Sequence, residues 1–331
     1  HVSNLFYNDR AIELAKALTE RTGFARVFFC NSGAEANEAQ LKLARRYHYA
    51  RGDVDRTGIV STWNSFHGRT MGALTMTGQP KYHEGMGPML PGVSWVEYGN
   101  LAALEQAVGK TTAAVILEPV QAEGGVIVAS DAYLAGVRAI CDAAGALLLL
   151  DEVQTGYGRT GTFLAREHSG IWPDACSLAK GIAGGFPFGA MLVRENVADV
   201  LVPGTHGTTF GGTPLACAAA LEVLRIFDDE GLVQNAAVRG ASAMARLEAA
   251  RANIPAIAAV RGQGLLIGIA LADDIDGGAV LSALLARGVL VTLASPSVIR
   301  LVPALNITEA ELDEGLTMIE AVLSDPPRKA S

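Results

Sequence analysis

Short apolar runs alternate with helical patterns through the first two-thirds of the sequence. Ser130 begins an amphipathic pattern that Gly145 ends, as a helix with a C-terminal glycine does. The next residues, 146–150, are all apolar, which is typical of a strand buried on both faces of a parallel sheet. Similar runs predict strands at 27–30, 59–63, 93–98 and 113–117. This alternation predicts an α/β fold with a mostly parallel sheet and right-handed crossovers.

The pattern changes after a helix predicted at residues 214–227. An alanine-rich amphipathic stretch at 232–251 is followed by shorter elements. Strands are expected near 265–271, 289–292 and 299–302, and helices near 279–287 and 309–323. At ~100–200 residues per domain, a chain of 331 residues is long enough for two domains. We therefore expect a large α/β domain at residues 1–228 and a smaller α+β domain at residues 229–331.

Composition narrows the functional classes. Half of the residues are hydrophobic and 18% are charged, which excludes a disordered chain. A net charge of −8 argues against nucleic-acid or anionic-membrane partners, and the apolar runs are far shorter than the ~18 residues of a membrane span. No signal peptide is visible after His1, and four cysteines stand singly, so we expect reduced, buried thiols in the cytoplasm. No metal-ligand spacing occurs, so no structural metal is expected.

Glycine is over-represented, at 37 of 331 residues or about 11% against a usual ~7%. Several glycines follow predicted strands. Ser32, Gly33 and Ala34 stand between a strand and a helix, where backbone N–H groups can bind a phosphate, although an ordinary helix N-cap is the simpler explanation of Ser32. Thr208 and Thr209 lie in a second glycine-containing loop that offers hydroxyl and N–H groups to an anion.

A third loop, after the strand at 59–63, carries Phe66, His67 and Arg69. Strand ends line the ligand crevice of open α/β sheets. Phe66 can stack on a planar ring and Arg69 can bind a carboxylate, but a packed phenylalanine beside a surface arginine is an equal alternative. Glu123 lies in an acidic, glycine-containing loop that is either part of the crevice or a solvated turn.

Charged residues at three apolar strands are the remaining candidates. Asp151 and Glu152 follow an apolar run as in a Walker-B strand, which makes an ATPase one alternative, but the chain lacks the G-x-x-x-x-G-K-[ST] loop that an ATPase needs. Asp151 could instead pair with a protonated ring nitrogen. Lys180 stands among apolar residues and glycines, so it is either a nucleophilic amine or a solvated lysine. Arg300, inside an apolar strand, needs a carboxylate partner or a ligand.

Taken in order, these segments resemble the class III (ω-amino acid) aminotransferases, which use pyridoxal 5′-phosphate (PLP) on the PLP-dependent transferase fold type I. The resemblance covers essentially the whole chain. Its motifs are SGAE at 32–35, FHGRT at 66–70, EPVQ-x-EGG at 118–125, DEVQTGYGRTG at 151–161, LAKG at 178–181, GTTFGG at 207–212 and IRLVP at 299–303. Within the class, residues 1–8 and 28–45 look most similar to members that act on N-acetylornithine.

The resemblance implies a role for each matching residue. Lys180 would form the internal aldimine with PLP and then move a proton between substrate and cofactor. Asp151 would pair with the pyridinium nitrogen, Gln154 would contact the ring hydroxyl, and Phe66 would stack on the ring. Thr209 would reach the phosphate of the neighbouring subunit, which implies a homodimer with shared active sites. The implied cofactor-binding set is Ser32, Gly33, Ala34, Phe66, His67, Asp151, Gln154, Lys180, Thr208 and Thr209.

Three residues are implied in substrate binding. Arg300 would bind the α-carboxylate of 2-oxoglutarate or glutamate, and Glu123 would pair with Arg300 when the ω-amine is bound. Arg69 would bind the α-carboxylate of N-acetylornithine. The implied reaction is a ping-pong transfer from N2-acetyl-L-ornithine to 2-oxoglutarate, giving N-acetyl-L-glutamate 5-semialdehyde and L-glutamate in arginine biosynthesis. Succinylornithine, ornithine and 4-aminobutyrate are alternative donors, and the nucleotide-binding ATPase is the alternative from another class.

The sequence departs from the family pattern in two ways. Ala122 stands where glycine is usual and Thr213 where asparagine is usual, which affects the shape of loops more than the type of reaction. Family members also carry several dozen residues before the position that matches His1. On that ground we expect a truncated or processed chain, for which a fragment that binds the cofactor without turnover is a further alternative.

Overall fold

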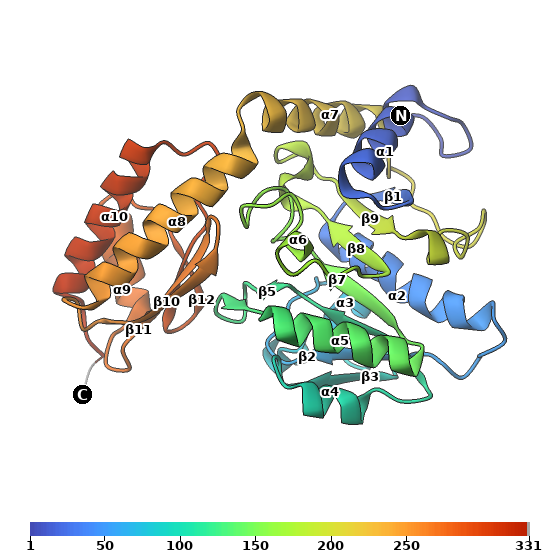
Figure 1. Cartoon of the computed structure of the whole chain (residues 1–331), viewed down its shortest axis with the longest axis horizontal. Helices are drawn as coiled ribbons and strands as arrows, with labels where there is room; N and C mark the ends of the chain where they lie inside the picture. The colour runs from blue at the N-terminus through green and yellow to red at the C-terminus, as the bar shows by residue number, and fades with distance from the viewer. Residues whose placement is uncertain (330–331) are drawn as a thin grey trace. The chain divides into compact units, whose positions relative to one another are not determined.

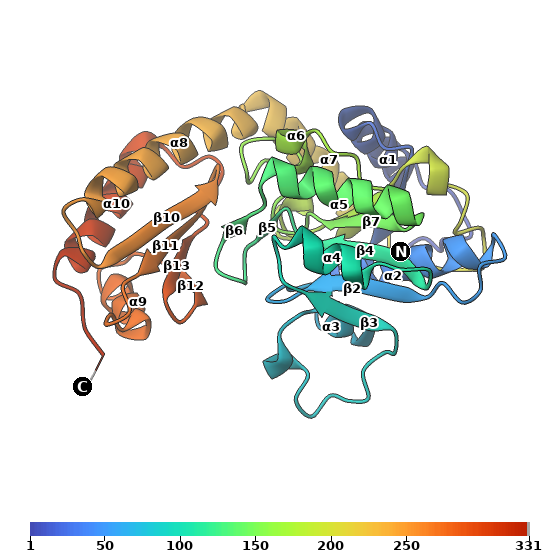
Figure 2. The same ribbon diagram turned by 60° about the horizontal axis from the view of Figure 1, so that its bottom comes forward.

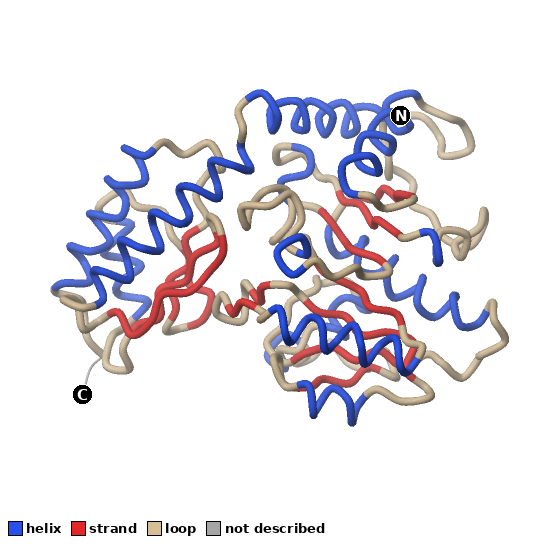
Figure 3. Tube along the Cα trace, in the orientation of Figure 1, coloured by secondary structure: helices blue, strands red, loops and turns tan. Residues whose placement is uncertain are grey.

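The computed structural model describes residues 1–329 and divides into two units, each with its own main sheet (Figure 3). The first unit comprises His1–Pro119, Ala129–Tyr157 and Arg166–Asp229. The second comprises Val120–Val128, Gly158–Ala165 and the chain from Glu230 onward. Two short segments of the second unit, residues 120–128 and 158–165, lie within the range 1–228 that was expected to form the large domain. The first of them joins the second unit because Val120, Ala122 and Val126 pack on apolar residues there.

The first unit is built on a seven-stranded sheet in the order β1-β9-β8-β7-β4-β2-β3 (Figures 1 and 2). Its strands are β1 (Arg26–Cys30), β2 (Gly58–Thr62), β3 (Val93–Val96), β4 (Thr112–Leu117), β7 (Leu147–Asp151), β8 (Ala175–Leu178) and β9 (Gly189–Val193). Only β9 runs against its neighbours, so the predicted mostly parallel sheet is confirmed, while β9 itself was not predicted. Every residue of β7 is buried, as its apolar sequence predicts.

Helices cover this sheet. They are α1 (Asp9–Thr22), α2 (Gly33–Tyr49), α3 (Met71–Met76), α4 (Leu101–Ala107), α5 (Asp131–Ala144), α6 (Arg166–Ser169) and α7 (Pro214–Asp229), with short 3-10 turns η1 (Pro80–Tyr82), η2 (Lys180–Ala183) and η3 (Glu195–Val197). Helix α5 begins and ends as predicted: the Ser130 hydroxyl accepts from the Tyr133 N–H, and Gly145 has a φ of 67°. Helix α2 packs on β8 and β9, and α5 packs on β7.

The second unit has a four-stranded antiparallel sheet in the order β10-β11-β13-β12. Its elements are α8 (Leu232–Arg251), β10 (Ile257–Gln263), β11 (Leu266–Leu271), α9 (Gly277–Leu285), β12 (Thr292–Ser295), β13 (Val298–Leu301) and α10 (Glu309–Ser324), together with the hairpin β5 (Val120–Gln121) and β6 (Ile127–Val128). Helices α8 and α10 lie side by side over the sheet (Figures 1 and 2). Strand β10 was not predicted.

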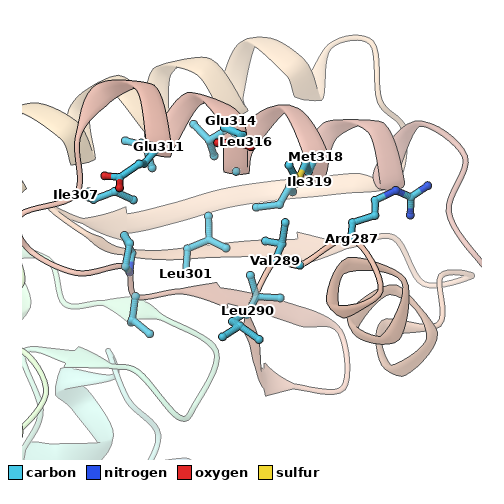
Figure 4. A pocket seen from close by; sticks show the side chains of 16 residues that line it. Arg287, Val289, Leu290, Leu301, Ile307, Glu311, Glu314, Leu316, Met318 and Ile319 are labelled. Carbon is cyan, nitrogen blue, oxygen red and sulfur yellow. The ribbon is translucent and has the colours of Figure 1, made fainter.

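The strand predicted near 289–292 is displaced by three residues, because β12 comprises Thr292–Ser295. Gly288 has a φ of 79°, and Val289, Leu290 and Val291 line a groove of about 450 Å³ beside α10 instead of pairing in the sheet. Figure 4 shows Val289 and Leu301 below the α10 side chains Leu316 and Ile319. The apolar run therefore faces a helix, and strand β12 begins only at Thr292.

The four cysteines are buried free thiols, as predicted. Burial raises the pKa of Cys30 and Cys141 to about 12 and that of Cys217 to about 11. Among residues 1–329, no helix combines the length and the apolar character that a membrane crossing needs.

Candidate active site

Five loops that carry candidate residues leave the same edge of the first unit's sheet. Strands β1, β2, β4, β7 and β8 all point the same way, so their carboxyl ends share that edge. The residues that follow or end these strands are Gly33, Phe66, Glu118, Asp151 and Lys180. In open α/β sheets this edge is where ligands bind. The fold therefore brings to one edge the residues that the sequence presented as separate motifs.

Asp151 ends β7 and is 4% exposed. Its Oδ2 accepts hydrogen bonds from Asn37 Nδ2 at 2.7 Å and from His67 Nδ1 at 2.8 Å. Its Oδ1 accepts from the Val153 N–H at 3.0 Å and from Ser177 Oγ at 3.3 Å. Four donors thus surround the carboxylate, as an acceptor-only, ionised group requires. The carboxylate is held in one orientation at the sheet edge.

The start of α2 is a candidate anion site. Ser32 is the N-cap, and its hydroxyl accepts from the Glu35 N–H at 3.2 Å, so the simpler explanation of this serine is correct. The N–H groups of Gly33 and Ala34 belong to the first turn, where a helix supplies no partner, and they stand where an anion is favoured. A Cβ on Gly33 would lie 2.8 Å from both methyl carbons of Val153. Glycine is therefore the residue that fits at this position.

The loop after β2 packs directly on this helix start. Gly68 has a φ of 131°, and a Cβ there would lie 2.6 Å from the Cβ of Ala34. Next to it, His67 is 2% exposed and is buried beside Asp151. The structure thus joins the SGAE and FHGRT motifs through contacts between small residues.

Phe66 and Arg69 form an aromatic–cationic group with Tyr82. The Arg69 guanidinium carbon lies 4.3 Å from the Tyr82 ring centre and 5.5 Å from that of Phe66. The Phe66 N–H donates to Glu118 Oε2 at 3.2 Å, which fixes this loop to the end of β4. Burial and the nearby Glu118 carboxylate raise the pKa of Tyr98, whose hydroxyl donates to the carbonyl oxygen of Glu118 at 2.7 Å.

Lys180 begins η2 directly after β8 and has a φ of 49°. This conformation is strained for a residue with a Cβ, and such strain is concentrated at functional sites. The neighbouring Ala179, Ile182 and Ala183 are buried, whereas Lys180 is exposed. The apolar neighbourhood predicted from the sequence is therefore present, and Lys180 itself is accessible to solvent. Three further non-glycine residues with positive φ also lie in or beside candidate loops: Asn64, Val126 and Tyr157.

Three predicted cofactor-binding residues lie in loops. Gln154 is half-buried in the turn after β7. Thr208 Oγ1 accepts from Asn31 Nδ2 at 2.9 Å, so its loop is tied to the residue just before α2. Thr209, the next residue, is exposed.

In the second unit, Arg300 is 9% exposed on β13 and forms an ion pair with Glu123. Arg300 Nε also donates to Thr292 Oγ1 at 3.2 Å. The carboxylate that a buried arginine needs is therefore supplied by the β5–β6 hairpin. The ion pair lies inside one unit, and the roles of these residues toward substrates stay predictions.

Glu152 does not act with Asp151 as a paired carboxylate site. It is 1% exposed, and its carboxylate accepts from Thr155 Oγ1 at 2.9 Å and from the Arg166 N–H at 2.9 Å. These hydrogen bonds tie the Glu152 carboxylate to the turn after β7 and to the start of α6. The Walker-B interpretation therefore lacks its second carboxylate as well as its phosphate loop.

Sequence reasoning missed Asn37 and Ser177, which both donate to Asp151. One signal for Asn37 was present in the sequence. Asn37 and Gln40 are polar, but they share the face of α2 on which Ala36 and Ala39 are buried. Polar side chains on a buried helical face need partners inside the protein.

Comparison with known proteins gives a consistent result. The family model described as Aminotransferase class-III matches residues 1–323. An acetylornithine aminotransferase from Myxococcus xanthus is 48% identical over 315 residues, covering 95% of this chain and 78% of that protein. A Pseudomonas aeruginosa protein named succinylornithine transaminase/acetylornithine aminotransferase is 45% identical over 326 residues, covering 98% and 80%.

Solved structures agree with these sequence matches. The ornithine aminotransferase of Toxoplasma gondii is 36% identical, with a TM-score of 0.94, and the match covers 98% of this chain and 78% of that one. A PLP-bound amine transaminase from an uncultivated Pseudomonas species is 33% identical, with a TM-score of 0.92 and coverage of 98% and 82%. The family resemblance of the motifs and the predicted fold class are thereby confirmed.

Proposed function

This chain belongs to the class III aminotransferases, and on that premise we propose that it transfers the terminal amino group of N2-acetyl-L-ornithine to 2-oxoglutarate. Relatives that are 44–48% identical over nearly the whole chain and named acetylornithine aminotransferase support this choice of donor. The observation that carries the proposal is the placement of Asp151 and Lys180 at the carboxyl ends of adjacent parallel strands.

The residues present fit PLP, the cofactor of this family. When bound, PLP supplies an electron-withdrawing ring that stabilises negative charge on the substrate carbon that loses a proton. The N–H groups of Gly33 and Ala34 would bind its phosphate, and the Asp151 carboxylate would pair with its ring nitrogen. Gln154 would contact the ring hydroxyl and Phe66 the ring face. The close-packed Gly33 supports this assignment because no larger residue fits there.

Lys180 would hold the cofactor covalently through Nζ and then move the proton. Once the donor's amine had displaced it, Nζ would accept the proton from the carbon that bears the donor's amino group and pass it to the cofactor; in the second half-reaction it would move a proton from the cofactor to the carbon that becomes the α-carbon of glutamate. An amine at the end of β8, on a strained residue, has the position and the limited freedom that this transfer requires.

Arg300, Glu123 and Arg69 would distinguish the two substrates. Arg300 would bind a carboxylate of 2-oxoglutarate, and its pairing with Glu123 would neutralise it when the amino donor is bound. Arg69, which lies beside the Tyr82 and Phe66 rings, would bind the α-carboxylate of the donor.

We also propose a cytoplasmic homodimer, in which Thr208 and Thr209 contribute to the neighbouring subunit's phosphate site. The support is a set of large apolar side chains that are well exposed in the single chain: Leu5 85%, Phe6 71%, Tyr7 94%, Phe210 58% and Leu215 66%. Exposed apolar side chains of this size are typical of a subunit interface. Phe210 follows Thr209 directly, so such an interface would include that loop.

Two measurements test the proposal. The first compares steady-state kcat/KM for four amines: N2-acetylornithine, N2-succinylornithine, ornithine and 4-aminobutyrate. The value should be highest for N2-acetylornithine, and a preference for ornithine or 4-aminobutyrate would refute the choice of donor. Succinylornithine is the second candidate because the P. aeruginosa relative carries both names. Borohydride reduction and mass spectrometry should place a pyridoxyl group on Lys180. Lys180→Ala should lose it, while Lys110→Ala, at another exposed lysine, should keep it.

A further inference from the structure

We propose that Asn37 and His67 are positioning residues that hold the Asp151 carboxylate toward the cofactor's ring nitrogen. The proposal rests on the function proposed above. It adds Asn37 to the residues that determine the reaction, and it gives His67 an indirect role, through Asp151, in place of a direct contact with the cofactor. The juxtaposition that supports it is a buried amide and a buried imidazole that meet on one carboxylate oxygen.

Asn37 is 1% exposed, and its side-chain amide is fully engaged. One N–H donates to Asp151 Oδ2 at 2.7 Å and the other to the His67 carbonyl oxygen at 2.8 Å. Its own carbonyl oxygen accepts from Gln40 Nε2 at 3.0 Å. Because every polar atom of the amide has a partner, rotation of the side chain would break several buried hydrogen bonds. Asn37 therefore fixes the position of Asp151 relative to the backbone at His67.

His67 is held just as firmly. Its backbone N–H donates to Thr77 Oγ1 at 2.9 Å, and its ring Nδ1 lies 2.8 Å from Asp151 Oδ2. On the far side, Nε2 lies 3.4 Å from Ser61 Oγ, whose hydroxyl donates to the Met76 carbonyl oxygen at 2.7 Å. A carboxylate has no hydrogen to give, so Nδ1 must be the donor in its bond to Asp151. The ring is thus oriented by groups on both sides.

This arrangement has a consequence for chemistry as well as for the fold. Two N–H donors on Oδ2 hold the rotation of the carboxylate, and a carboxylate held in one orientation is what a protonated ring nitrogen pairs with. If the Asn37 amide only joined α2 to β7, its removal would leave the protonation of the cofactor's ring nitrogen unchanged. A positioning residue would change it, and that difference can be measured.

The test compares Asn37→Leu with the control Asn196→Leu, at an exposed asparagine. Asn196 Nδ2 donates to Oδ1 of Asp174 at 2.8 Å, so the control also removes an amide from a buried aspartate of the same unit. Loss of a hydrogen bond to a charged group predicts a fall in kcat of about 10- to 100-fold for Asn37→Leu. The KM for 2-oxoglutarate should change by less than about threefold, because Asn37 does not touch that substrate.

Two readouts need no turnover. The Kd of the apoprotein for PLP, from quenching of tryptophan fluorescence, should rise about tenfold in Asn37→Leu. With ¹⁵N-labelled PLP, the ring-nitrogen signal should move toward that of the unprotonated pyridine. Asn196→Leu should change neither. Equal effects in the two variants, or an unchanged ring-nitrogen signal in Asn37→Leu, would overturn the proposal.

An Asp151→Asn background separates positioning from general damage. If Asn37 acts through the charge of Asp151, Asn37→Leu should lower kcat by less than about threefold further in that background. A full further loss there would overturn the proposal. If Asn37→Leu does not fold, Asn37→Ser and His67→Phe take its place, with a smaller effect expected for the serine because it keeps one donor. Binding of PLP without transamination of any amine would refute the proposed function but not the role of Asn37 and His67. Failure to bind PLP would refute the proposed function and that role together.

Discussion

Replacing Gly68 by alanine should destabilise the first unit and weaken PLP binding together. Gly68 lies in the loop that carries Phe66, packs against the start of α2, and has a φ of 131°. A Cβ on this residue would lie 2.6 Å from the Cβ of Ala34, 2.9 Å from the Ala34 Cα and 3.1 Å from the Ala73 Cβ. None of these atoms is the end of a flexible side chain, so the backbone of α2 or α3 would have to move.

The magnitude follows from two terms. Unstrained carbon–carbon contacts are ~3.5–4.0 Å, so the added methyl group overlaps its neighbours severely, and such overpacking costs about 1–3 kcal/mol. The positive φ adds a further cost of about 1–3 kcal/mol for a residue with a Cβ. Together they predict a loss of about 2–6 kcal/mol in the free energy of unfolding of the first unit. Movement of Ala34 should also misplace the N–H group that would bind the phosphate.

Urea denaturation followed by tryptophan fluorescence measures this loss, because Trp63, Trp95 and Trp172 all belong to the first unit. The control is Gly52→Ala: Gly52 also has a positive φ, 87°, but a Cβ there would meet nothing within 4 Å. It should carry the conformational cost without the clash. If Gly68→Ala and Gly52→Ala lower stability equally and leave the Kd for PLP unchanged, the packing argument for this loop is wrong.

Two other predictions follow from the second unit and from the buried thiols. Glu123→Gln should lower the KM for 2-oxoglutarate by about 3- to 10-fold and slow the half-reaction with the amino donor, because Arg300 loses the carboxylate that competes with substrate. Stopped-flow measurement of each half-reaction gives the two effects. If the ratio of the two half-reaction rates is the same as in the unchanged protein, Glu123 does not control which substrate Arg300 binds. At pH 8, iodoacetamide should modify fewer than about one cysteine per folded chain but all four in urea, since burial raises the pKa of Cys30 and Cys141 to about 12. Because burial raises the thiol pKa values, the thiols ionise at a lower pH in the unfolded chain than in the folded one. The urea midpoint should therefore fall as the pH rises above about 9, and a midpoint that rises between pH 8 and 10 would contradict this argument.

The elements that could be predicted are those whose signals are local. Ser130 and Gly145 mark the ends of α5 because the cap and the left-handed turn depend on single residues. The apolar run of β7 identified a strand buried on both faces because no polar residue interrupts it. The run at 289–291 has the same local character, yet it lines a groove beside α10. Leu290 in that run is 83% exposed, so local hydrophobicity alone does not separate a strand buried on both faces from a segment that lines an open groove; distant parts of the chain decide which of the two forms.

The same distinction applies to the candidate active site. Gly33, Asp151 and Lys180 follow or end strands, so a reading of strand ends was sufficient to place them at one edge of the sheet. Asn37 could not be placed in that way, because its contact with Asp151 spans 114 residues and depends on how α2 packs against the sheet. His67 was found for its motif, but its burial against Asp151 was not. Residues that orient other residues are the ones that sequence reasoning misses, since their partners are set by packing.

The pairing of Glu123 with Arg300 shows how a chain segment can belong to a unit other than the one its sequence position suggests. The two residues are 177 positions apart, and Glu123 lies between stretches of the first unit. The β5–β6 hairpin nevertheless packs through Val120, Ala122 and Val126 on the second unit. Val126 keeps a φ of 55°, which a β-branched residue adopts only when its surroundings impose it, and a Cβ on Gly268 would lie 2.8 Å from the Val126 Cβ. The packed Val126 therefore helps to hold the hairpin that carries Glu123 against the second unit, and with it the ion pair to Arg300.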